Sequence, residues 1–241
     1  MITLNNRIKK NKTMKTITLL KKLETKPIFR VQDVERIYMC DRSYAKLLLH
    51  RLTKRGIVKR VARNAYTLQD DIWLISSNIV YPCYISFWSA SYFLGYTEQI
   101  VNTIYVATTI GRKPIEFEGY TIEFVPLSEF FGYKKIRTEK GDIFIAENEK
   151  LLIDAFLRPE KCGNFAEIVN IYENAEIDEK KVIEYLKRTK KQSVIKRVGY
   201  LLEKTKKIDI SYAFNLDRNY VLLNPFSKEW SKINSKWRVK I

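Results

Sequence analysis

One predicted helix carries polar side chains that could contact the bases and phosphates of DNA. Between residues 42 and 52, the apolar residues recur at the spacing of a helix with one buried face, formed by Ala45, Leu48, Leu49 and Leu52. The opposite face carries Arg42, Ser43, Lys46 and His50. The first three lie in the first half of the helix, which is the part of a recognition helix that reaches base edges in the major groove. Arginine can bond guanine through two donors, whereas serine and lysine can bond bases or phosphates.

The elements on either side of this helix predict a winged helix-turn-helix. Upstream, apolar residues at helical spacing indicate a first helix, and Asp41 can cap the second one. Downstream, Gly56 can take the left-handed conformation that ends a helix. Alternation over residues 57–61 then predicts a strand that turns back into residues 65–68. This hairpin would be the wing, and its candidate DNA contacts are Lys59, Arg60, Arg63 and Asn64.

Positive charge is concentrated in the segment that contains these elements. The 241 residues carry a formal net charge of +17. Residues 1–70 hold 18 Lys and Arg against 5 Asp and Glu, residues 71–160 hold 8 against 12, and residues 161–241 hold 18 against 10. Charge concentrated on one module is typical of proteins that contact phosphates. The alternative is a winged helix that binds protein and whose basic residues are only solvated.

Changes in charge and periodicity predict an α+β chain with three parts. The first, residues 1–70, is the winged helix-turn-helix, and its residues 1–12 are expected to be a flexible basic arm. The second, residues 71–160, alternates helices with extended segments and predicts an α+β domain with a small sheet. The third, residues 161–241, predicts a helical C-terminal region with an extended tail.

Aromatic side chains and one glycine are expected to serve packing. The aromatic residues around the helix that Ser86 would cap could stack bases of single-stranded nucleic acid, but their spacing is more typical of a core against a sheet. They are Tyr84, Phe87, Trp88, Tyr92, Phe93 and Tyr96. Trp230 and Trp237 are expected to anchor the tail. Gly199, inside a predicted helix, is expected to permit close helix packing, because glycine costs a helix about 1 kcal/mol relative to alanine.

Few residues could support catalysis. His50 is the only histidine, so the sequence offers no Ser–His–Asp triad and no His-containing metal cluster. The alternative function is a metal-dependent nuclease with a winged-helix targeting domain, using Glu116, Glu123 and the run 147–150 to hold Mg²⁺ and orient water. Acidic residues are also favoured at helix starts and on exposed hairpin faces. We therefore expect no enzyme, no metal and no cofactor.

The cysteines and the hydropathy indicate a cytoplasmic protein. Three widely separated cysteines without a CxxC pair suit a reducing compartment and argue against structural zinc. No apolar run approaches the roughly 18 residues of a membrane span. The basic N-terminal segment lacks the apolar stretch that follows such charges in a signal peptide. We expect no membrane partner, and the sequence leaves the oligomeric state open.

The order of several blocks carries a family resemblance. After the predicted winged helix come PCYISFWSASYFLGYTE, TIYVATT, ENEKLLIDAFLRPEKCGNFAEIV and VIKRVGYLLE. This order resembles the AbiEi-type antitoxins, predicted transcriptional regulators of type IV toxin–antitoxin systems that act in abortive infection, an antiviral defence. The resemblance implies a repressor that binds operator double-stranded DNA of its own operon. It also implies an antitoxin that counters a nucleotidyltransferase-like toxin, apparently without a stable complex. By position, Arg42, Ser43 and Lys46 match the family's recognition helix, and residues 60–64 match its wing.

A basic run in the third part is a candidate surface for the antitoxin role. Its members are Lys190, Lys191, Lys196 and Arg197. A cationic face could dock an acidic toxin surface or shield the RNA or nucleotide substrate that the toxin modifies. We favour shielding, because the resemblance implies no tight complex with the toxin. The remaining alternative is that these side chains are only solvated.

Overall fold

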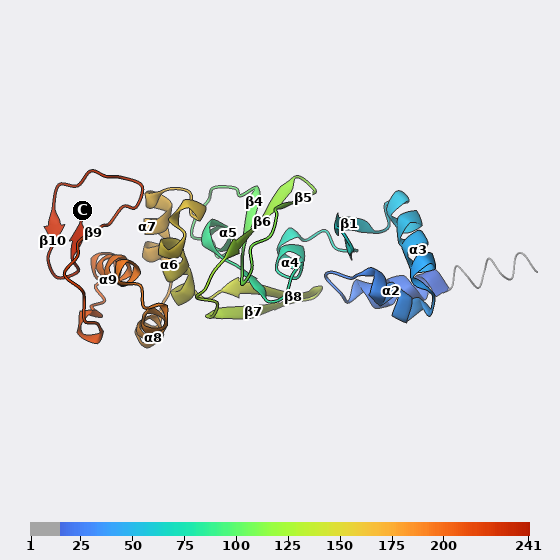
Figure 1. The fold of residues 1–241 in the computed structure, drawn as a ribbon, viewed down its shortest axis with the longest axis horizontal. Coiled ribbons are helices and arrows are strands. Elements are labelled where there is room, and N and C mark those ends of the chain that lie inside the picture. The colour runs from blue at the N-terminus through green and yellow to red at the C-terminus, as the bar shows by residue number, and fades with distance from the viewer. Residues whose placement is uncertain (1–14) are drawn as a thin grey trace, which may run out of the picture.

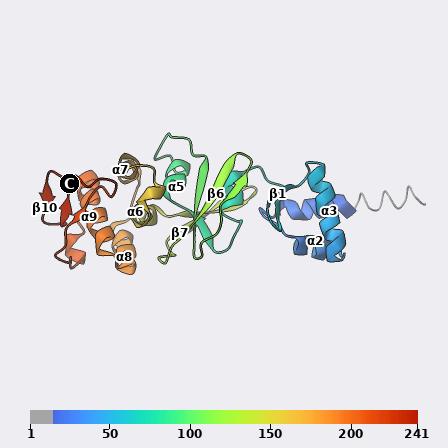
Figure 2. The same cartoon turned by 45° about the horizontal axis from the view of Figure 1, so that its top comes forward.

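The protein is elongated, with helices at both ends and a sheet between them (Figures 1 and 2). The computed structural model describes residues 15–241, so the predicted basic arm at residues 1–12 lies outside the described residues. Within the described part, no helix is both long enough and apolar enough to cross a bilayer. The mixture of helices and sheets confirms the expected α+β class.

The N-terminal part contains the two helices and the hairpin that the sequence predicts. Residues 15–24 are helical and are followed by α2 (Val31–Tyr38), α3 (Arg42–Lys54), β1 (Lys59–Ala62) and β2 (Ala65–Thr67). The apolar faces of the three helices meet in one core cluster around Leu23, Val34 and Leu49, which are fully buried. Phe29 bridges Tyr66 of β2 in antiparallel fashion, as expected for a short strand beside the hairpin.

A mixed six-stranded sheet forms the middle of the molecule. Its strands are β3 (Cys83–Ile85), β4 (Thr103–Thr108), β5 (Ile115–Phe117), β6 (Tyr120–Pro126), β7 (Tyr133–Thr138) and β8 (Gly141–Ala146). They lie in the order β5-β6-β4-β3-β8-β7. The pairs β4–β6 and β3–β8 are parallel, and the other three are antiparallel. Strand β8 therefore lies inside the sheet, between β3 and β7, and the two edge strands are β5 and β7.

Two short helices pack on this sheet, and the second begins after Ser86, as the sequence predicts. They are α4 (Ile72–Ser76) and α5 (Phe87–Phe93). Asp71 caps α4 through Oδ1, which accepts from the Trp73 amide at 2.9 Å. Ser86 occupies the cap position of α5, but its hydroxyl bonds Asp154 instead of the helix. Tyr84 and Phe87 are fully buried and the other aromatic residues of this group pack against the core, which confirms their predicted role in packing.

The helix α6 (Asn148–Leu157) is central to the C-terminal half, because it lies between the sheet and three further helices (Figure 1). Eight successive residues, 149–156, are buried, as expected for a helix covered on all sides. The covering helices are α7 (Phe165–Asn174), α8 (Glu179–Thr189) and α9 (Gln192–Lys206), and short 3₁₀ turns lie at Pro159–Lys161 and Ser211–Ala213.

The tail forms a small sheet against α9. Its strands are β9 (Val221–Leu222), β10 (Ile233–Asn234) and β11 (Val239–Lys240), in the order β10-β11-β9. Trp237 is fully buried and anchors the tail as predicted, whereas the prediction for Trp230 was wrong: it is 47% exposed, beside Lys240. At Gly199, which was expected to permit close helix packing, the atoms nearest to an added Cβ belong to the ring of Trp237 in the tail.

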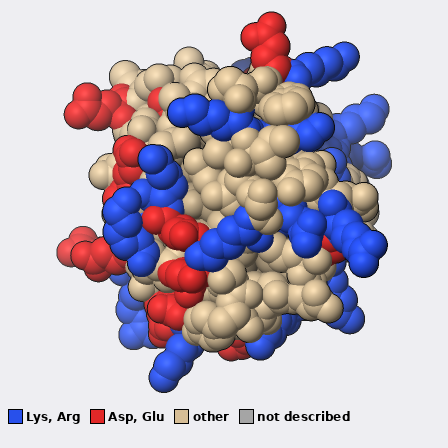
Figure 3. All heavy atoms as spheres, turned by 90° about the vertical axis from the view of Figure 1, so that its left-hand side faces the viewer, with Lys and Arg blue, Asp and Glu red and all other residues tan. Residues whose placement is uncertain are grey.

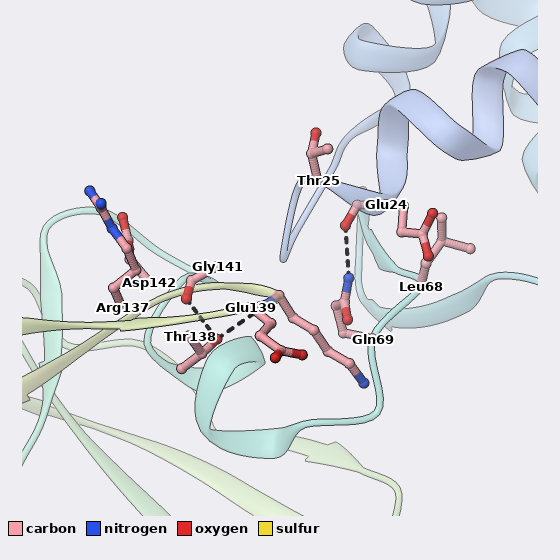
Figure 4. Close-up of a pocket in the computed structure, with 10 residues that line it drawn as sticks. Glu24, Thr25, Leu68, Gln69, Arg137, Thr138, Glu139, Gly141 and Asp142 are labelled. Carbon is pink, nitrogen blue, oxygen red and sulfur yellow. Dashed lines mark hydrogen bonds and ion pairs between the residues drawn. The ribbon is translucent and has the colours of Figure 1, made fainter.

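The N-terminal part contacts the sheet through the β7–β8 turn and through the hairpin. A polar pocket of about 550 Å³ lies between the end of the first helix and that turn (Figure 4). In its wall, the side-chain Nε2 of Gln69 donates to the Glu24 backbone carbonyl at 2.9 Å. Val61 and Ala65 of the hairpin are buried in the larger core cluster, together with the sheet. The packing therefore does not separate at residue 70, where the charge balance changes.

Candidate nucleic-acid interface

Every candidate DNA-binding residue that the sequence predicts on α3 lies on the exposed face of this helix. Asp41 caps the helix, with its Oδ1 accepting from the Tyr44 amide at 2.9 Å. Ala45, Leu48, Leu49 and Leu52 are buried, and Arg42, Ser43, Lys46 and His50 are exposed. The 13 residues of α3 include Arg51 and Lys54 as further exposed cations and no Asp or Glu. The face is thus uniformly basic or neutral, which suits contact with a polyanion.

The connection between α2 and α3 is a tight turn held by backbone conformation. Met39 takes a left-handed conformation, with φ of 53°, and ends α2. The other end of α2 is fixed by Asp33, whose carboxylate accepts from the Arg30 amide at 2.8 Å and from Lys26. Partial burial alone would raise the pKa of Asp33, but the bonds from Lys26 and Arg30 lower it below its usual value. These bonds fix the start of α2 to the segment that precedes it.

The hairpin is fastened to the rest of the molecule on both sides. At its tip, Asn64 takes a left-handed conformation, with φ of 59°. Its Oδ1 accepts from the Val31 amide at 3.1 Å, and its Nδ2 donates to Gln32 at 3.3 Å. The predicted DNA contact Asn64 therefore has a structural task, because its carboxamide ties the hairpin to the start of α2.

Lys59, another predicted DNA contact, joins the hairpin to the sheet. Its Nζ lies 2.9 Å from Asp70 and 3.1 Å from Glu118 in the β5–β6 turn. The bonds to these two carboxylates raise the pKa of Lys59. Arg60 and Arg63 are exposed. Of the three cationic candidates on the hairpin, Arg60 and Arg63 have no ion pair within residues 15–241, so their charges are available to a ligand.

A second group of cations meets at the other end of the hairpin. Arg30, Arg63, Arg112 and Lys113 line one pocket of about 190 Å³, and no acidic residue lines it. Three of these residues, Arg30, Arg112 and Lys113, were not predicted as functional residues from the sequence. The only local signal was the basic turn Gly-Arg-Lys-Pro at residues 111–114, whose partners come from distant parts of the chain.

The four residues of the predicted antitoxin surface do not form one exposed face. Lys190 and Lys191 are exposed, and Lys191 lies 3.0 Å from Glu129. Lys196 is fully buried and bonds Asp217 at 2.6 Å, so its inclusion in an exposed surface was wrong. Arg197 is partly buried: its Nε donates to the Leu222 carbonyl at 2.8 Å and its guanidinium lies over Phe156. Burial lowers the pKa of Arg197.

Figure 3 shows the end of the molecule that bears the C-terminal elements. There, Lys and Arg side chains surround a largely uncharged centre, and Asp and Glu gather along one side. A helical surface carries charge only where its side chains point outward. Lys190 and Lys191 precede α9 and are exposed, whereas residues 194–196 in its first turns are buried. A continuous cationic face over this run is therefore not present.

The carboxylates of the nuclease alternative are bonded to separate partners. Glu116 accepts from the Thr121 hydroxyl at 2.9 Å, and Glu123 forms an ion pair with Lys161 at 2.7 Å. Glu147 accepts from Tyr185 at 2.5 Å. Among residues 15–241, no three His, Cys, Asp or Glu side chains gather as a group that could hold a metal ion.

One buried polar cluster lies in the core, away from these surfaces. Lys150 and Asp154, one turn apart on α6, form an ion pair in which both side chains are fully buried. Asp154 also accepts from Ser86 at 2.7 Å and from Tyr84 at 3.1 Å. Burial raises the pKa of Asp154, although Lys150, Ser86 and Tyr84 oppose that shift. The cluster links α6 to β3 and the start of α5.

Comparison with known proteins gives one family match. Residues 18–69 match the family model described as a transcriptional regulator, AbiEi antitoxin. The match covers most of the first helix, α2, α3 and the hairpin. The matched family is the one that the order of sequence blocks resembles, although those blocks lie after residue 69, beyond the matched residues. The search of curated proteins gives no match for the chain.

Proposed function

We propose that this protein is a sequence-specific DNA-binding repressor of its own operon and the antitoxin of a type IV toxin–antitoxin system. In this proposal, residues 15–67 act as a winged helix-turn-helix, α3 enters the major groove of the operator and the hairpin contacts the backbone. The protein acts in the cytoplasm on operator DNA, without an enzymatic step. Its functional partner is a nucleotidyltransferase-like toxin.

The observation that carries the DNA-binding proposal is the exposed face of α3. It combines side chains that can bond bases with an absence of acidic residues, in the segment that matches a family of transcriptional regulators. Arg42, Ser43 and Lys46 occupy the first half of the helix, where base contacts are made. In this proposal, the exposed side chains of His50, Arg60 and Arg63 contact phosphates. Lys59 and Asn64 support the hairpin from their bonded positions.

The antitoxin role is supported by the family match, but the surface predicted for it does not hold as a set of four exposed residues. Only Lys190 and Lys191 of the predicted run point to solvent, so a surface that includes them must extend to neighbouring elements. We propose that this surface shields the toxin's RNA or nucleotide substrate and does not hold the toxin in a stable complex. Such an interaction should weaken with salt, because screening shortens the range of exposed charges to about 10 Å or less.

Operator binding is tested by titrating full-length protein with the DNA upstream of its operon and with a shuffled duplex. The full chain is needed, because a fragment ending near residue 70 would expose Val61 and Ala65. Arg42→Ala should weaken operator binding by about 1–3 kcal/mol and relax specificity, whereas Arg63→Ala should weaken binding to both duplexes. Arg218→Ala, an exposed arginine at the other end of the molecule, is the matched control. Equal affinity of the unaltered protein for both duplexes at physiological salt would exclude specific repression.

The antitoxin role is tested by co-expression with the neighbouring open reading frame, if that encodes a nucleotidyltransferase-like protein. The full-length protein should restore growth, and the Arg42→Ala/Lys46→Ala variant should do so as well, because DNA binding and neutralisation use different surfaces. Lys190→Glu/Lys191→Glu should abolish rescue, while Lys21→Glu/Lys22→Glu, an exposed pair on the first helix, should not. Growth arrest in the presence of soluble, unaltered protein would exclude an antitoxin.

A further inference from the structure

Four cationic side chains from separate parts of the chain converge where the hairpin meets the sheet. Arg30 precedes α2, Arg63 lies in the turn of the hairpin, and Arg112 and Lys113 lie between β4 and β5. We propose that the pocket they line is a second phosphate-binding site, which holds the backbone of the operator duplex beyond the reach of α3. The choice of DNA as the source of the phosphate rests on the proposed function.

The four charges have no carboxylate to balance them. Within residues 15–241, none of the four side chains forms an ion pair, although Lys59 at the other end of the same hairpin has two acidic partners. The guanidinium of Arg30 donates to the Ile79 carbonyl at 3.4 Å, which directs it toward the pocket. Like charges held together repel, so the arrangement is stabilised when an anion binds between them.

The walls of the pocket strengthen the attraction for an anion. Apart from the four cations, the lining side chains are aliphatic or aromatic, and they include Ala65, Ile79 and Phe124. A concave site with one sign of charge and low-dielectric walls concentrates the electric field inside it. Arginine guanidinium groups present paired donors that match phosphate oxygens, and three of the four cations are arginines.

The position of the pocket suits a duplex bound at α3. Arg63 belongs both to the hairpin that would act as the wing and to the pocket, so the two sites are continuous. The hairpin also lies beside β5, which follows the loop of Arg112 and Lys113. A duplex that contacts α3 and the hairpin can therefore extend over these two side chains. The interface would then include the middle part of the chain, whose overall charge is negative.

The test compares duplex binding by the Arg112→Gln/Lys113→Gln variant with that of Lys180→Gln/Lys228→Gln, which removes the same charge from exposed lysines at the far end. Affinity is measured across salt concentrations on the operator and on a shuffled duplex. Each lost phosphate contact should reduce the slope of log K against log salt by about 0.9, so the pocket variant should lose roughly 2 on both duplexes. Arg112→Lys should retain its share of the slope, and thermal melts should show that every variant is folded.

The same variants separate a DNA phosphate from a free one. One outcome would show that the ligand is a free phosphate and not the operator. In it, inorganic phosphate or ATP binds the unaltered protein in calorimetry, the pocket variant loses this binding, and the salt slopes of duplex binding are unchanged. That outcome overturns the choice of DNA as the source of the phosphate. Unchanged slopes without phosphate or ATP binding overturn the site itself, as does an equal loss of slope in the far-end control. A failure of the proposed repressor function can be told apart from a failure of the pocket proposal. The first appears as equal affinity of the unaltered protein for the two duplexes. The second is still measured in that case, by comparing the salt slopes of the unaltered protein and the pocket variant on the shuffled duplex.

Discussion

The indole ring of Trp237 fills the space beside Gly199 that a side chain at position 199 would occupy. A Cβ on Gly199 would lie well inside van der Waals contact with the six-membered ring, and Trp237 is fully buried. The indole Nε1 donates to Glu203, one turn further along α9, at 2.5 Å. The tail is therefore fixed to α9 by one ring that requires a glycine beneath it.

Gly199→Ala should destabilise the protein, although alanine favours a helix more than glycine does. The expected gain in helix propensity is about 1 kcal/mol, whereas forcing a methyl group into a packed site costs typically about 1–3 kcal/mol. The free energy of unfolding from urea titration should thus fall. In a Trp237→Ala background, where the ring is absent, Gly199→Ala should instead increase the free energy of unfolding. A more stable Gly199→Ala single variant would show that the ring does not need this space.

Breaking the buried ion pair of Lys150 and Asp154 should lower the free energy of unfolding far more than breaking a surface ion pair. Asp154→Ala leaves the Lys150 ammonium buried without its partner, which should cost about 3–5 kcal/mol in urea unfolding. Adding Lys150→Met should recover part of that loss, because it removes the unpaired charge. The matched control is Lys135→Met, which breaks a half-exposed pair with Asp142 and should cost about 1 kcal/mol or less. Additive effects of the two core substitutions would contradict a coupled pair.

Local patterns predicted most elements, because the forces that specify them act between neighbouring residues. Helical spacing and the cap at Asp41 identified α3, and the alternation over residues 57–61 identified the first strand of the β1–β2 hairpin. Long-range contacts could not be predicted in this way. Nothing near Lys196 in the sequence indicates that its charge is buried against Asp217, which lies 21 residues further along the chain.

The sequence predicted the part of the candidate interface on α3 but not the part in the pocket between the hairpin and the sheet. Arg42 and Lys46 follow from the periodicity of one helix, so the sequence alone places them on the exposed face. Arg112 and Arg30 become neighbours only when the hairpin packs beside β5. Asn64 was predicted by residue type alone, but the fold uses its carboxamide to hold the backbone of α2.

Removing Asp217 should destabilise the protein more than removing Lys196. Asp217→Ala leaves the buried Lys196 ammonium with only the Asn219 carbonyl, and loss of such a partner costs about 1–3 kcal/mol. Lys196→Met removes the buried charge itself and leaves Asp217, which is 41% exposed, in contact with water. This substitution should be close to neutral. The comparison is made by urea unfolding of the two single variants, and a larger loss for Lys196→Met would contradict the assigned burial.

The tail should also loosen in acid, through Asp209. The bond from Lys236 at 2.8 Å, with those from Ser211, lowers the pKa of Asp209 to about 2. A carboxylate whose pKa is lower in the folded state stabilises the fold above its unfolded pKa, and this contribution disappears as the pH falls through the folded pKa. Asp209→Asn should therefore be less stable than the unaltered protein at pH 7, by about 1 kcal/mol or less for such an exposed pair, and the two should converge between about pH 4 and pH 2. Glu229→Gln, an exposed carboxylate without an ion pair among the described residues, should show no such convergence. A constant difference between Asp209→Asn and the unaltered protein from pH 7 to pH 2.5 would rule out this contribution.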